Sequence, residues 1–142
     1  MKTLLSALVL HTHNFRVLHW NCCGLDFDAT HELMSSYGDK LSEFTDEVAE
    51  SLISTGGSPV NLFTAMTILK DSEHNFTVTD DAKTYCTEEA LNTTNNILKE
   101  LIALYDECND CDLHPAIVSK LQEHQYWLIK ESDYKGRRRL QK

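Results

Sequence analysis

An uninterrupted apolar stripe between residues 30 and 55 is the feature that most constrains the fold of this chain. Its members recur at steps of three and four positions: Met34, Tyr37, Leu41, Phe44, Val48 and Leu52. This spacing places all of them on one face of an α-helix. The run Gly56-Gly57-Ser58-Pro59 then provides a firm helix stop. The stripe therefore predicts one long amphipathic helix with a single buried face.

Helical periodicity marks most of the remaining chain as well, and the sequence carries no sustained strand pattern. Besides residues 30–55, we expect helices at residues 2–21, 61–69, 80–107 and 114–132. Gly24 separates the first helix from the second, and Asp28 or Thr30 is available to cap the second. The short helix lies within a long connection, residues 60–79. Two helical hairpins joined by this crossover predict an all-α four-helix bundle.

Charge is distributed unevenly along the 142-residue chain, whose net charge is −9. Residues 1–134 carry 8 Lys and Arg against 22 Asp and Glu, whereas residues 135–142 carry five basic residues and no acid. We therefore expect one acidic domain over residues 1–134, long enough to bury a core, and a basic C-terminal tail over residues 135–142. An acidic body attracts cations and argues against a general nucleic-acid surface.

No stretch reaches the ~20 apolar residues that a membrane span needs, and the N-terminal apolar run lacks a secretory cleavage site. We therefore expect a cytoplasmic protein with no membrane partner. The number of cysteines is odd, which favours reduced thiols in this setting. The sequence assigns no role to these five residues: Cys22, Cys23, Cys86, Cys108 and Cys111.

Two histidines and two carboxylates form a candidate metal site: His19, His31, Asp46 and Glu50. These residue types bind transition metals such as iron, and the same set also suits zinc. His19 and His31 flank the Gly24 break, so an antiparallel helix pair brings them to the same end of the bundle. Asp46 and Glu50 stand at i and i+4 and share one helix face. Taken singly, each of the four also fits an ordinary surface or capping position.

The spacing within this set predicts an oligomer. His31 and Asp46 are fifteen positions apart on one expected helix, which is about 22 Å along the axis at 1.5 Å per residue. No single metal site spans that distance. If all four residues serve one site, the histidines come from one subunit and the carboxylates from another, as a two-fold axis between antiparallel helices allows.

A wider set of residues surrounds these four: His19-Trp20-Asn21, Gly24, Phe27, His31-Glu32-Leu33, Asp46, Ala49-Glu50, Gly56-Gly57-Ser58-Pro59, and Trp127 behind His124. In this order and spacing they resemble the Dps family of miniferritins, the DNA-binding proteins from starved cells. The resemblance implies a ferritin-like four-helix bundle with a short helix in the crossover between helices 2 and 3. It also implies a hollow shell of twelve subunits that oxidises iron(II), commonly with hydrogen peroxide, and stores ferric iron.

By this resemblance, His19 and His31 of one subunit and Asp46 and Glu50 of its partner are the catalytic iron ligands of a ferroxidase. The resemblance also places Trp20 beside the site, where an aromatic ring intercepts stray oxidising equivalents. Ordinary packing at the interface is the alternative role for Trp20.

The chain departs from the family pattern in two places. Ser35 stands where many relatives carry an acid, which weakens one of two metal positions. Many DNA-binding members have a lysine-rich arm before the first helix, whereas this chain starts almost at the helix. We therefore do not expect strong DNA binding, and any binding by residues 135–142 should weaken steeply with salt. A DNA-protecting shell with weak or no ferroxidase activity is the alternative function, and a zinc-regulated cage is a third.

Three acids gather near the loop between the last two long helices: Asp106, Asp110 and Asp112. In the Dps family this region lines acidic three-fold pores, so these side chains are candidates for an iron entry path. A solvated, acid-rich loop is the alternative.

Overall fold

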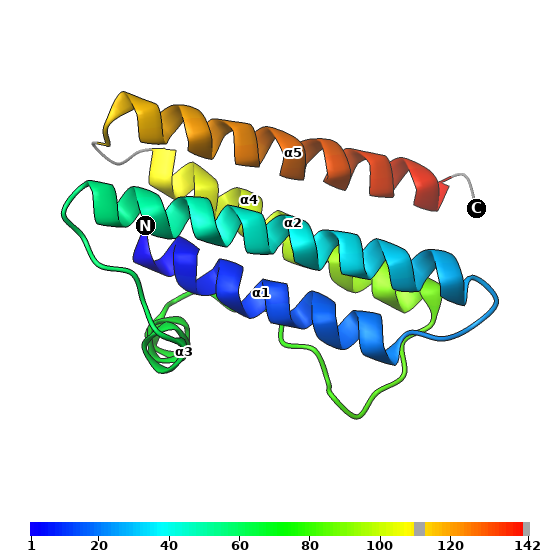
Figure 1. Ribbon diagram of the computed structural model, residues 1–142. Coiled ribbons are helices and arrows are strands. Elements are labelled where there is room, and N and C mark those ends of the chain that lie inside the picture. Colours follow the sequence, from blue (N-terminus) through cyan, green and yellow to red (C-terminus); the bar gives the residue numbers. More distant parts are fainter. Residues whose placement is uncertain (110–112, 141–142) are drawn as a thin grey trace.

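The computed structural model describes residues 1–109 and 113–140, with side chains described as far as Asp133. The described residues form five helices and no strand: α1 (Lys2–Asn21), α2 (Phe27–Ser54), α3 (Leu62–Asp71), α4 (Thr87–Asn109) and α5 (Pro115–Leu140). Figure 1 shows the four long helices running side by side, with the short α3 lying beside α1 in the crossover. The predicted all-α bundle with a short helix between α2 and α4 is confirmed.

The core lies between the four long helices. All six residues of the predicted α2 stripe are buried, and they pack against apolar side chains of α1, α4 and α5 that are also fully buried, such as Phe15, Leu98 and Leu128. At the end of α2, Gly56 adopts a φ of 84°, and the Gly57 amide donates to the Leu52 carbonyl at 2.9 Å. The glycine pair therefore closes the helix, because a positive φ is easily adopted by glycine.

The helix α4 begins at Thr87, later than its periodicity predicted, because the preceding residues pair with the end of α1. The Tyr85 amide donates to the Asn21 carbonyl and the Cys23 amide donates to the Tyr85 carbonyl, each at 2.8 Å. These two bonds form an isolated parallel bridge between Cys22 and Tyr85. A pattern of local spacing carries no information about such a distant pairing.

The predicted caps of α2 were wrong, since both residues lie inside the helix. Asp26 occupies the N-cap position, and its side chain makes no capping hydrogen bond. The Thr30 hydroxyl instead lies 3.0 Å from the hydroxyl of Thr87, so it links the start of α2 to the start of α4.

At the other end of the chain, α5 extends to Leu140 rather than ending near residue 132. Within the described ranges, no helix combines the length and apolarity needed to cross a membrane.

A buried amide on α1 holds the second half of the crossover in place. The Asn14 side chain donates to the Thr77 carbonyl at 2.8 Å, and its oxygen accepts from the Thr79 amide at 3.1 Å and the Thr79 hydroxyl at 3.0 Å. Thr77 in turn donates from its amide to Glu100 on α4 at 2.9 Å and also bonds that carboxylate through its hydroxyl. The crossover is therefore attached to two helices by polar contacts.

Asn14→Ala should reduce the free energy of unfolding by about 2–3 kcal/mol, because it leaves backbone groups of Thr77 and Thr79 without partners. Urea denaturation measures this loss, and limited proteolysis should show faster cleavage within residues 72–86. The matched control is Asn96→Ala, at an exposed position of α4, which should change stability by no more than about 0.5 kcal/mol. Equal effects of the two substitutions would show that Asn14 does not anchor the crossover.

Candidate metal centre

His19 on α1 and His31 on α2 are stacked, with ring centroids 3.7 Å apart and planes inclined by 21°. Nδ1 of His19 lies 2.8 Å from the His31 carbonyl oxygen, and Nδ1 of His31 lies 2.8 Å from the His19 carbonyl oxygen. Because a carbonyl only accepts, each Nδ1 carries the proton and each Nε2 keeps a free lone pair. Metal-binding histidines are commonly held this way by a hydrogen bond at the other ring nitrogen.

The local backbone explains why the two histidines meet. Gly24 has a φ of 112°, so the chain reverses direction within the few residues between α1 and α2. His19 lies in the last turn of α1 and His31 in the second turn of α2, and Phe27 stacks on His31 with a centroid distance of 5.0 Å. The prediction that both histidines lie at one end of the bundle is confirmed.

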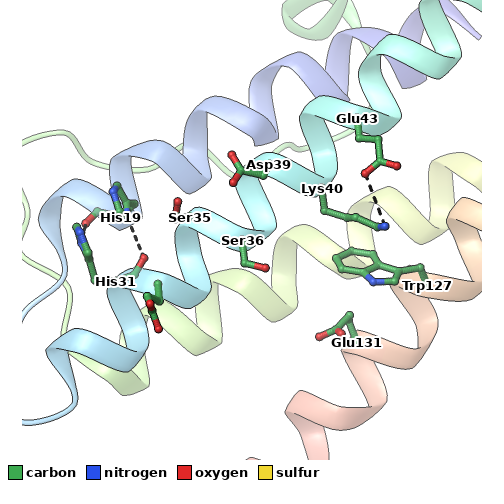
Figure 2. A pocket seen from close by; sticks show the side chains of 10 residues that line it. His19, His31, Ser35, Ser36, Asp39, Lys40, Glu43, Trp127 and Glu131 are labelled. Atoms are coloured by element: carbon green, nitrogen blue, oxygen red, sulfur yellow. Dashed lines mark hydrogen bonds and ion pairs between the residues drawn. The ribbon is translucent and has the colours of Figure 1, made fainter.

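The histidine pair lines one end of an open pocket of about 770 Å³. Figure 2 shows His19 and His31 on α1 and α2, Ser35 and Asp39 further along α2, and Trp127 on α5. Ser35 lies one turn after His31 and faces the same pocket. An acid at this position would supply a carboxylate next to the histidines, and the serine hydroxyl does not replace it.

The structure does not bring Asp46 and Glu50 to the histidines of the same chain. Both carboxylates are exposed on the continuous helix α2, and neither lines the pocket. Within residues 1–109 and 113–133, no three His, Cys, Asp or Glu side chains gather closely enough to hold a metal ion. A single chain thus supplies the histidine half of the predicted set in one place and the carboxylate half in another.

Trp20 is 63% exposed and does not line the pocket, although it follows His19 in sequence. Its ring makes an edge-to-face contact with His13, with centroids 6.0 Å apart. Its role in trapping oxidising equivalents stays a prediction.

The predicted pore residues are only partly within the described chain. Asp106 is exposed on α4 and accepts a hydrogen bond from the Gln125 side chain at 2.6 Å. Asp110, Asp112 and Cys111 lie outside the described residues. The acidic pore therefore stays a prediction.

Sequence reasoning missed a buried polar chain beside the pocket. His124 on α5 is 2% exposed and stacks on Phe44 with centroids 3.9 Å apart. Its Nε2 lies 2.7 Å from a Glu47 carboxylate oxygen, and its Nδ1 lies 2.8 Å from the Tyr105 hydroxyl. Because the carboxylate only accepts, Nε2 carries the proton and the Tyr105 hydroxyl donates to Nδ1. The sequence did contain one indication of its burial: His124 follows Leu121 by three positions and precedes Leu128 by four, so it lies on the same buried face of α5.

Comparisons with known proteins agree with this fold. The sequence model of one protein family, described as a ferritin-like domain, matches residues 2–131, so the chain belongs to the ferritin-like family. It is 32% identical over 103 residues to the DNA protection during starvation protein of Porphyromonas gingivalis. That alignment covers 72% of this chain and 61% of the relative, so the chain spans less than two-thirds of the relative's length.

Solved structures give the same result at the level of the fold. Antigen TpF1 from Treponema pallidum superposes with a TM-score of 0.81 at 18% identity, over 95% of this chain and 85% of that one. A Dps protein from Bacillus brevis superposes with a TM-score of 0.72 at 21% identity, over 95% and 89% of the two chains. Together with the curated relative, these matches confirm the resemblance to Dps proteins.

Acidification should destabilise the protein through His124. Burial lowers the pKa of His124 below its ordinary value of 6.5, although hydrogen bonding to Glu47 opposes this. As the pH falls below about 6.5, His124 stays neutral in the folded protein, whereas the same histidine takes up a proton in the unfolded chain. The free energy of unfolding should therefore keep its full value above about pH 6.5 and decrease below it. Urea denaturation at pH 7.5 and 5.5 measures the loss.

His124→Gln should reduce this pH dependence, and His13→Gln, at an exposed position, should leave it unchanged. The two variants should also differ at pH 7.5, because only His124→Gln breaks the contacts to Glu47 and Tyr105. If the free energy of unfolding depends on pH in the same way in the wild type and in His124→Gln, then His124 is not the cause of the loss of stability at low pH.

Proposed function

We propose that this protein oxidises iron(II) with hydrogen peroxide and stores the ferric product in a hollow homo-oligomeric shell, as a dodecamer of the Dps kind. The observation that carries the proposal is the reciprocally bonded histidine pair. Each imidazole is fixed by the other's backbone carbonyl, and within the described residues neither Nε2 takes part in a hydrogen bond or ion pair. Two such nitrogens, together with carboxylate oxygens, form a donor set that suits ferrous iron.

Of the four carboxylates that line the pocket, Glu32, Asp39, Glu43 and Glu131, two make close contacts within the chain. Asp39 pairs with Arg16 at 2.8 Å, and Glu131 accepts the Tyr37 hydroxyl at 2.7 Å. Within the described part of the chain, no three His, Cys, Asp or Glu side chains, these acids included, gather closely enough to hold a metal ion. We therefore infer that the remaining ligands come from outside the chain.

Asp46 and Glu50 of a neighbouring subunit fit this requirement. They are exposed and one helical turn apart on α2, so both can reach the same site. An antiparallel pairing of two copies of α2 about a two-fold axis places the carboxylates of each copy opposite the histidines of the other. Each interface then contains two equivalent iron sites.

The chemistry consumes two electrons per peroxide: two Fe²⁺ and H₂O₂ with two protons give two Fe³⁺ and two waters. Supplying both electrons together avoids release of a hydroxyl radical, which protects the cell.

Ser35 places a hydroxyl, and not a carboxylate, beside the histidines, so the second iron should bind more weakly than the first. The excess of acids over residues 1–134 favours approach of Fe²⁺ and opposes close contact with DNA. Zinc would compete for the same donors.

His31→Ala combined with Asp46→Ala should slow the fast phase of peroxide-driven iron oxidation by at least about tenfold, since even indirect changes around metal ligands cost 10–100-fold. Stopped-flow absorbance of ferric iron measures the rate, and light scattering checks that the particle keeps its size. The matched control is Glu73→Ala with His114→Ala, an exposed pair elsewhere on the surface, which should retain the wild-type rate. Wild-type oxidation by the first double variant in an intact shell would refute the site.

A further inference from the structure

The bridge between Cys22 and Tyr85 fixes the register of two short segments that lie far apart in sequence. The Cys23 amide donates to the Tyr85 carbonyl at 2.8 Å, and the Tyr85 amide donates to the Asn21 carbonyl at 2.8 Å. In this parallel arrangement Cys22 stands opposite Tyr85, and Cys23 and Cys86 are the residues that follow them in the two segments. Continuing the parallel register by one residue would place these two cysteines opposite each other.

Burial shows which way the side chains point. Cys22 and Tyr85 are buried, at 5% and 6% exposure, whereas Cys23 and Cys86 are both exposed. Successive side chains of an extended segment alternate between faces, so Cys23 and Cys86 share the outer face of the bridge. Neighbouring parallel segments lie about 5 Å apart, which falls within the range of roughly 4.4–6.8 Å between the Cα atoms of a disulfide.

We propose that Cys23 and Cys86 are a peroxide-reactive thiol pair that closes to an intramolecular disulfide. The pair lies outside the iron site and uses none of its ligands. The bond would join the end of α1 directly to the start of α4, next to the turn that holds the two histidines together. Both thiols are reduced in the structure.

The reaction balances with peroxide as the only oxidant. One thiolate attacks H₂O₂, which breaks the O–O bond and gives a sulfenic acid and, after proton transfer, water. The second thiolate then attacks the sulfenic sulfur, the S–S bond forms, and the hydroxide leaves as a second water. The two thiols together lose two electrons and two protons, and peroxide is reduced to two waters.

The test uses the intact assembled protein, freed of iron and fully reduced. It is treated with hydrogen peroxide, its remaining thiols are alkylated, and it is digested without reductant for mass spectrometry. We expect a cross-linked peptide pair containing residues 23 and 86, with an intact mass of one chain. Cys22→Ser is the matched control, because Cys22 shares a peptide with Cys23, and this variant should still form the link.

Cys23→Ser and Cys86→Ser should each abolish the link and leave the other thiol as a sulfenic acid that dimedone traps. Alkylation of both thiols after peroxide treatment, or a link that joins two chains or uses Cys22, would overturn the proposal. Because no iron is present, a negative result leaves the ferroxidase proposal intact, and a protein that fails to oxidise iron could still form the disulfide.

Discussion

The pair of hydrogen bonds between the His19 and His31 rings and each other's carbonyls is the interaction on which the candidate site depends. It joins α1 to α2 where the chain reverses at Gly24, and it sets the tautomer of both rings. A ring with its proton on Nδ1 has its lone pair on Nε2, which is the state that binds a metal. The same two bonds therefore position both rings and leave Nε2 of each ring available to a metal.

The rest of the bundle keeps this arrangement fixed through contacts that span long stretches of sequence. The pairing of Cys22 with Tyr85 holds the end of α1 against the start of α4. Asn14 holds the crossover against α1. His124 links α2 and α4 to α5 through a part-buried hydrogen bond to Glu47 and a buried one to Tyr105, and the buried bond is costly to break in a low-dielectric interior.

Local sequence patterns predicted the helices and part of the site, because periodicity and glycine stops act over a few residues. They predicted which face of α2 is apolar and buried, and they predicted that His19 and His31 lie at the same end of the bundle. They could not predict the late start of α4, which results from pairing with residues more than sixty positions earlier. The link between Glu47 and His124 was missed for the same reason. In the proposed shared site, the place of Asp46 relative to the histidines depends on a second subunit, which the sequence of one chain does not position.

The most direct test of a shared iron site is complementation between two inactive variants. One variant carries His19→Ala and His31→Ala, and the other carries Asp46→Ala and Glu50→Ala. Each alone should form shells without fast iron oxidation. Shells co-assembled from equal amounts should recover about a quarter of the wild-type fast phase, because random pairing completes one site in four. If co-assembled shells stay inactive while wild-type shells oxidise iron, the ligands do not come from two subunits and the account fails.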